Sequence, residues 1–383
     1  MKKLSIWLVS LLIVSGTLVP HSVVANPLKK NKTTSQIATK NSVFLLPQSE
    51  LILEINLHRL ITELLPKVKE AFPTETSKIS ESVDKLFAEA LSSGVDLTQA
   101  RRLLLGLNIF GDKVSGAMIF EGIELDKTLM ENYLKSSGKS AEIIEYKGKT
   151  IVVEKKPQTA AKKRIVKSTK ISPDNVKNVV SQINDSFLDT VSFVQLDNQR
   201  LAMGDPSEVK KIIDHLPDSE PTQNQKLAAA MLETDSSALI RLAVQVPDSF
   251  RQSMSKEQVF KSLTALQQVS ASLNVADDLS LAISASLGTG SLDEASQLYE
   301  NLSALIVILK SVMVEDKDPD TKLIGQLLSN LTLAPKMNNV VLSMTVPLSV
   351  YQPLLKSFQE GSASKKTSAA TKTVTPARTR RKK

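Results

Sequence analysis

The side chains most often used in catalysis are sparse in this sequence of 383 residues. It contains no Cys and only three His. His58 and His215 lie far apart without the close spacing of paired metal ligands. His215 falls at the end of a predicted helix, where the helix dipole favours a cation. The sequence therefore excludes thiol chemistry and thiolate sites, and it predicts no metal site and no cofactor.

One segment resembles the end of a phosphate-binding loop. Ser137-Gly138-Lys139-Ser140 contains the Gly-Lys-Ser ending, but the glycine required five residues before Gly138 is replaced by Tyr133. The segment also follows a predicted helix, whereas such a loop follows a strand. We therefore expect no nucleotide site here.

A second segment has the acidic spacing of a calcium loop. Asp316, Asp318 and Asp320 occupy its first ligand positions, but Thr321 and Leu327 replace the glycine and glutamate that complete it. We interpret this segment as a solvated loop in which Asp320 caps the next helix.

The sequence leaves one kind of hydrolase as an alternative. No Gly-x-Ser-x-Gly elbow is present, so a serine hydrolase has no support. Glycoside hydrolysis needs two carboxylates that can be distant in sequence. Glu121 and Asp112, beside a predicted strand pair, are the candidates. We assign no catalytic residue, and the hydrolase stays an alternative.

Alternating apolar side chains predict the strands that would position these groups. They are expected at 51–57, 102–110, 113–121, 142–146, 150–154, on both sides of a turn at 197–198, and at 240–246, 279–287, 331–335 and 339–346. The Lys147-Gly148-Lys149 segment is predicted to form a turn.

Helical spacing predicts the other elements. Helices are expected at 57–68, 77–91, 125–136, 176–183, 205–216, 248–254, 256–273, 292–313, 323–328 and 348–358. Pro66 should kink or restart the first of them. Asp205-Pro206 is a strong start signal, with the Asp as N-cap and the Pro as first helical residue.

The two halves of the chain follow the same order of elements. In each half, a strand, helices and a further strand lead to a helix that opens with Leu-Asp, at Leu125-Asp126 and at Leu292-Asp293. We interpret this order as a duplication of one module. Chance similarity between amphipathic patterns is the alternative.

The N-terminus has the pattern of a secretory signal peptide. A basic Met1-Lys2-Lys3 start precedes an apolar run over 4–19, and Val23-Val24-Ala25 offers a cleavage site before Asn26. The run is shorter than the ~20 residues of a spanning helix, which favours cleavage over an uncleaved anchor. No later segment is apolar and long enough to span. We expect an exported protein, periplasmic or extracellular after cleavage.

Basic residues are concentrated in three polar segments. The net charge of +8 falls to +6 when Lys2 and Lys3 leave with the signal peptide. Segments 26–42, 155–170 and 361–383 carry +4, +7 and +8, together +19, so the remainder carries −13. Like charges in such runs repel one another and favour disorder.

The C-terminal tail is the candidate surface-binding segment. Its cations are Lys365, Lys366, Lys372, Arg378, Arg380, Arg381, Lys382 and Lys383. Polybasic segments bind phosphates without sequence preference, but this tail has no aromatic side chain to stack on bases. An anionic envelope surface or polymer is therefore a better expected partner than nucleic acid. A purely solubilising tail is the alternative.

These features predict an α+β protein with two related modules of mostly antiparallel sheet and amphipathic helices. The expected division is a signal peptide (1–25), a disordered basic leader (26–42), a first module (43–216, with a basic loop at 155–170), a linker (217–235), a second module (236–360) and a disordered basic tail (361–383).

The predicted core resembles a group of uncharacterised exported bacterial proteins. The resemblance rests on the stretch from Phe44-Leu45-Leu46-Pro47 to Asn56, on Leu201-Ala202-Met203-Gly204-Asp205-Pro206, and on Asn339-Val340-Val341-Leu342-Ser343-Met344. It covers about 43–358 and includes no catalytic motif. It implies the same fold and adds no site residue.

Three functions remain. The first is an exported, non-catalytic envelope protein that binds a partner protein or an anionic polymer or surface. The second is a periplasmic carrier of an apolar ligand, enclosed by Ser/Ala-alternating strands such as 279–287 and by amphipathic helices. The third is the carboxylate-dependent hydrolase.

Overall fold

The computed structural model describes most of the region between the predicted leader and the predicted tail. The described ranges are 42–72, 95–108, 115–124, 141–155, 190–216, 224–254, 263–314 and 327–352, with pieces of one to three residues between them. The signal peptide, the tail and most of the leader and of the basic loop lie outside these ranges.

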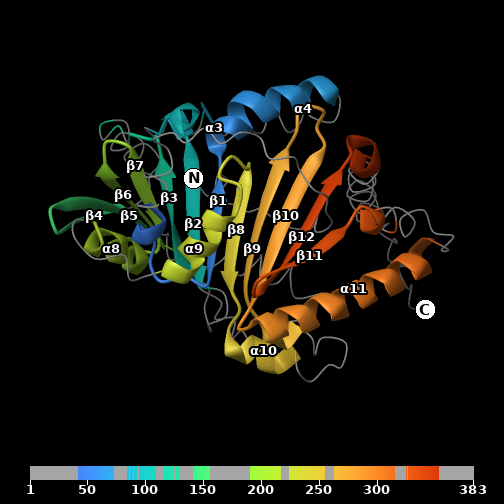
Figure 1. Cartoon of the computed structure of the whole chain (residues 1–383). Helices are drawn as coiled ribbons and strands as arrows, with labels where there is room; N and C mark the ends of the chain where they lie inside the picture. Colours follow the sequence, from blue (N-terminus) through green and yellow to red (C-terminus); the bar gives the residue numbers. More distant parts are fainter. Residues whose placement is uncertain are drawn as a thin grey trace, which may run out of the picture.

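The described strands form one antiparallel sheet of twelve strands, in the order β11-β12-β10-β9-β8-β1-β2-β3-β7-β6-β5-β4 (Figure 1). They are β1 (Leu51–Ile55), β2 (Arg102–Asn108), β3 (Ser115–Glu121), β4 (Ala141–Tyr146), β5 (Lys149–Lys155), β6 (Thr190–Asp197), β7 (Arg200–Gly204), β8 (Ile240–Gln245), β9 (Leu266–Val275), β10 (Leu281–Thr289), β11 (Thr332–Lys336) and β12 (Asn339–Val346). The predicted α+β class with antiparallel sheet is confirmed. The sheet is continuous across both predicted modules, whose boundaries stay a prediction.

The described helices include α3 (Leu57–Arg59), the π-helix η1 (Leu60–Leu64), α4 (Leu65–Ala71), the 3-10 helix η2 (Leu97–Gln99), α8 (Pro206–Asp214), α9 (Gln225–Glu233), α10 (Asp248–Met254) and α11 (Leu292–Val314). Asp205 caps α8 as predicted, because its side chain accepts a hydrogen bond from the Ser207 N–H at 2.8 Å.

Pro66 has the predicted effect on the first helix. Proline has no N–H to donate to the preceding turn. The helix therefore widens before it: the Leu65 N–H bonds to the Leu60 carbonyl, five residues back, and α4 begins anew with Pro66 in its first turn.

Side-chain alternation divides the core between the two faces of the sheet. On the first face, Ile52 of β1 belongs to a buried cluster with α8 and α9. On the second face, Leu53 and Ile55 join a cluster with α3, η1 and η2. Helix α8 packs against β3, β6 and β7, whereas α9 packs against β8 and β9. Figure 1 shows α11 beside the β10–β12 half of the sheet.

The helix predicted at 256–273 is wrong over its second part, which forms β9. Leu263, Leu266, Val269 and Leu273 fit helical spacing, but residues 269–275 also alternate apolar and polar. β9 pairs with β8 on one side and with β10 on the other. These two ladders of backbone hydrogen bonds select the strand.

The predicted linker at 217–235 contains α9, which buries Leu227 and Met231 in the first-face cluster. Just before α9, Asn224 ties this segment to the start of the described chain. Its side chain accepts from the Ser49 N–H at 2.8 Å and donates to the carbonyls of Leu46 and Pro47.

The register repeats on the two sides of the β1–β8 pair. Residues that lie opposite one another on successive strands form a row on one face. The first-half row is Leu53, Leu105, Met118 and Met203. The second-half row is Leu242, Ala271, Ala285 and Leu342. Leu53 and Leu242 lie opposite each other, so a pseudo-two-fold axis passes between them. The predicted duplication agrees with this repeated register, although its origin stays a prediction.

A buried ion pair lies at the β1–β8 junction. Glu54 of β1 faces Arg241 of β8, with 2.5 Å between Glu54 Oε2 and an Arg241 terminal nitrogen, and both side chains are at least 95% buried. Arg241 also donates to the Met231 carbonyl at the end of α9 at 3.2 Å. The Arg102 Nε lies 3.9 Å from Glu54 Oε1. This junction therefore fixes two strands and a helix together.

We predict that the Glu54→Gln substitution destabilises the fold by about 3 kcal/mol, because it leaves the buried Arg241 charge without its carboxylate. The urea midpoint measures this loss. The Glu54→Leu, Arg241→Met double variant removes both charges and should regain much of the stability. An unchanged midpoint in Glu54→Gln would contradict the structural role.

Candidate functional site

Charged side chains of alternating sign cross six neighbouring strands on the first face of the sheet. Their order, from β6 to β8, is Asp197, Arg200, Glu121, Arg102, Glu54 and Arg241. Each acid thus has a basic neighbour on the same face. The β6–β7 end of this row opens into a recess.

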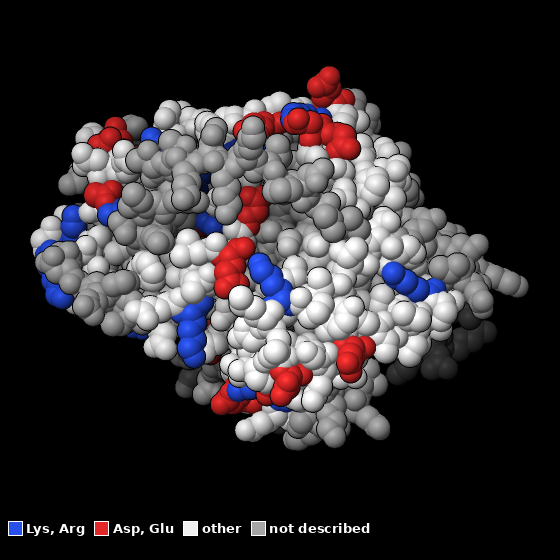
Figure 2. Space-filling model, in the orientation of Figure 1, with Lys and Arg blue, Asp and Glu red and all other residues white. Residues whose placement is uncertain are grey.

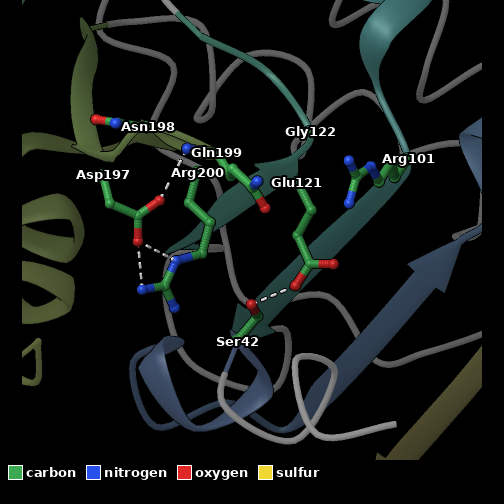
Figure 3. A pocket seen from close by; sticks show the side chains of 8 residues that line it. All are labelled: Ser42, Arg101, Glu121, Gly122, Asp197, Asn198, Gln199 and Arg200. Carbon is green, nitrogen blue, oxygen red and sulfur yellow. Dashed lines mark hydrogen bonds and ion pairs between the residues drawn. The ribbon is translucent and has the colours of Figure 1, made fainter. Parts of the chain in front are cut away.

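The recess has a volume of about 580 Å³. Figure 3 shows its lining residues, which come from four segments: Ser42, Arg101, Glu121, Gly122, Asp197, Asn198, Gln199 and Arg200. Backbone hydrogen bonds hold three of these segments together. The Arg101 N–H donates to the Glu121 carbonyl and the Gly122 N–H donates to the Gln199 carbonyl, both at 2.7 Å.

Gly122 makes this close approach sterically allowed. Its φ of +85° is strained for other residues. A Cβ there would lie 2.5 Å from the Gln99 carbonyl oxygen. A side chain at 122 would therefore push apart the segments that line the recess.

The two carboxyl groups of the recess are in different electrostatic states. Burial raises the pKa of Glu121, although the Ser42 hydroxyl donates to Glu121 Oε1 and Arg102 lies nearby, and both of these lower it. Burial also acts on Asp197, but hydrogen bonds from Arg200 and from the Gln199 N–H hold its pKa below the usual value. The Arg200 Nε lies 2.6 Å from Asp197 Oδ2.

The recess tests the hydrolase alternative only in part. Glu121, one of the two candidate acids, lines it, whereas Asp112 lies outside the described residues. Asp197 is the second carboxylate of the recess, and no spacing pattern in the sequence indicated it. Because Asp197 is paired with Arg200, its negative charge is already balanced.

The remaining candidates do not line the recess, although the His58 N–H donates to the Arg101 carbonyl at 3.1 Å. His58 belongs to α3 and His215 is the C-cap of α8, as its predicted position implied. No group of three His, Asp or Glu among the described residues could hold a metal ion. The segments 137–140 and 316–320, and all eight basic residues of the tail, lie outside the described part of the chain.

The second face of the sheet differs between the two halves. All four side chains of the first-half row are buried, with 3 to 6% of their surface exposed. All four side chains of the second-half row are only partly buried. Leu348, Val350 and Tyr351 pack on this face near Met344 and Val346. The apolar face is thus sealed in one half and partly open in the other.

Helix α11 adds a second apolar surface in the same half. It contacts β10, β11 and β12, yet only Ala295 and Leu298 among its described side chains are buried. Val307, Ile308 and Val312 are 59 to 66% exposed. Figure 2 shows few charged side chains over β10, β12 and α11. Within the described ranges, none of the helices has the length and apolarity needed to cross a bilayer.

We predict that the Glu121→Gln substitution flattens the pH dependence of stability. In the folded protein the pKa of Glu121 is raised above its usual value of 4.5, so the protonated carboxyl group stabilises the fold. This stabilisation is complete below pH 4.5 and is lost as the pH rises through the raised pKa. As the pH rises from 4.5 to 8, the melting temperature of the wild type should fall relative to that of the variant. Glu300→Gln, on an exposed position of α11, is the matched control. Parallel wild-type and Glu121→Gln profiles would contradict the raised pKa.

Comparisons with known proteins reveal a distant structural likeness. No family model matches this chain, and no curated protein matches it. Crystal form I of TP0453, from Treponema pallidum, is similar over 83% of this chain and 96% of its own, with 9% identity and a TM-score of 0.37. Forms III and IV give 9% identity and TM-scores of 0.38 and 0.39, each over 82% of this chain and over 97% and 95% of their own.

Proposed function

We propose that this chain is an exported envelope protein whose second half binds an apolar ligand of the acyl-chain type. The observation that carries the proposal is the contrast between the two rows on the second face. The same register gives a sealed apolar surface around Leu53 and a partly open one around Leu242. Apolar surface left in contact with water favours a ligand that covers it.

Side-chain size explains why the second half has room for a ligand. Leu105 and Met118 fill the centre of the first-half row, whereas Ala271 and Ala285 occupy the same positions in the second-half row. Each alanine removes several methylene-sized groups from the space above the sheet. An apolar chain lying there would replace contacts that the larger side chains make in the first half.

The opposite face of these strands is chemically different, which directs the ligand to the second face. Ser270 and Ser272 of β9 are buried on the first face, and Ser284 of β10 lies beside Ser272. Hydroxyl groups need hydrogen-bond partners that an acyl chain does not offer. The alternation of Ser and Ala noted in the sequence thus separates a polar face from an apolar one.

We predict that the Ala271→Leu, Ala285→Met double variant loses apolar-ligand binding, because it places the large side chains of the sealed row at the corresponding positions of the open row. The variant should bind a pyrene-labelled fatty acid about tenfold more weakly, as each ~1.4 kcal/mol of lost contact corresponds to a factor of ten. Fluorescence titration of delipidated protein measures the affinity, and native mass spectrometry reveals co-purified lipid.

The matched control is Ser284→Ala, which changes β10 on the opposite face and should leave the affinity unchanged. A melting curve confirms that the double variant is folded. Wild-type affinity in a folded double variant would refute the site, as would wild-type protein that takes up no fatty acid.

The charge distribution favours a second candidate function, attachment to an anionic envelope surface or polymer. The three basic segments carry +19, whereas the remainder of the mature chain carries −13. Separated charges of this size favour electrostatic adhesion that weakens with salt. Attachment and ligand binding are compatible, because they use different parts of the chain.

We predict that deletion of 361–383 releases the protein from the envelope fraction. Removal of eight cations weakens adhesion, so the truncated protein should appear in the wash at a lower salt concentration than the full chain. Stepwise salt extraction followed by immunoblotting measures this shift. Identical extraction profiles would rule out anchoring by the tail.

A further inference from the structure

We propose that the recess beside Glu121 binds a phosphate-type oxyanion, with Arg101 as the main contact. This site lies in the first half of the sheet and is independent of the apolar ligand.

Arg101 is the cation of the recess that has no partner. Arg200 is paired with Asp197 at 2.6 Å. Among the described residues, the guanidinium of Arg101 makes no hydrogen bond and no ion pair, and its side chain is exposed. Figure 3 shows it at the mouth of the recess, facing the space beside Gln199 and Glu121. Its position directly before β2 is fixed by the backbone bond to Glu121.

A neutral donor lies on the same side of the recess as this guanidinium: Figure 3 shows the Gln199 side chain extending toward Glu121 and Arg101, whereas the Asn198 side chain points away from them. The side-chain amide of Gln199 also makes no hydrogen bond within the described chain. Arginine binds an oxyanion through two parallel N–H donors, and an amide group can complete the set. The Glu121 carboxyl repels an anion only when it is ionised, and burial raises its pKa. The recess thus offers more donors than negative charge.

The second half of the sheet contains the same backbone arrangement without these charges. There, the Thr289 N–H donates to the Asn338 carbonyl at 2.9 Å, as the Gly122 N–H donates to Gln199. The row that corresponds to Glu121, Arg200 and Asp197 is Gly288, Asn339 and Lys336. The backbone arrangement at this end of the sheet therefore forms without paired acidic and basic side chains. The charged residues of the first half are an addition that a ligand explains.

Two sources can supply a phosphate-type group: free phosphate or the headgroup of a lipid. Isothermal titration calorimetry of the full mature chain with inorganic phosphate tests the first. Titration with dihexanoyl phosphatidate, below its micelle-forming concentration, tests the second. We expect one saturable site for at least one probe, and the probe that binds identifies the source.

Substitutions distinguish the recess from the basic segments of the chain. Arg101→Gln should weaken the saturable site about tenfold, and Arg101→Lys should retain part of the affinity because it keeps the charge without the paired donors. Lys226→Gln removes one exposed charge at the start of α9 and should leave the affinity unchanged. Because the Arg101 side chain has no partner, its variants should melt as the wild type does.

Two results would overturn the proposal. One is the absence of a saturable site for both probes. The other is equal affinity in Arg101→Gln and Lys226→Gln, which would assign the binding to overall charge. Neither result bears on fatty-acid binding by the second half, which is measured with a different probe.

Discussion

Burial of the Glu54–Arg241 pair is the constraint on which the arrangement of the sheet depends. Removing two charges from water is costly unless each finds its partner and further hydrogen bonds. Here the partners come from β1 and β8, which are 187 residues apart in sequence, and the α9 carbonyl of Met231 supplies a further contact. The pair thus favours one register at the central junction, because a shift of one strand by one residue would turn its charge to the opposite face, away from its partner.

The two halves that meet at this junction share one arrangement of strands but have different side chains on their surfaces. The first half fills its apolar row with Leu and Met and places charged side chains at one end of its strands. The second half has alanine at the two central positions of the corresponding row and leaves the corresponding strand ends nearly uncharged. The arrangement does not require either choice. The differences therefore mark where each half has been adapted.

Much of the fold could be predicted from local patterns, but the sites could not. Asp205-Pro206, Pro66 and the alternation at 339–346 act through neighbouring residues, and each had its expected effect. β9 was missed because its apolar spacing also fits a helix, and only pairing with β8 and β10 decides between them. Glu121 was noticed as an acid at a strand end. The turn at 197–198 was predicted, but neither it nor Arg101 was recognised as part of a site, because only strand order brings these segments to one end of the sheet.

The pseudo-two-fold axis between Leu53 and Leu242 has a consequence for how such a chain can arise. A contact related by a two-fold axis is the contact that two identical subunits make in a symmetric dimer. A single half would expose the edge of β1 or β8, and two such halves could close that edge by pairing with each other. In a dimer, this closure depends on protein concentration. In the joined chain it does not, and each half is free to change its sequence without changing the other.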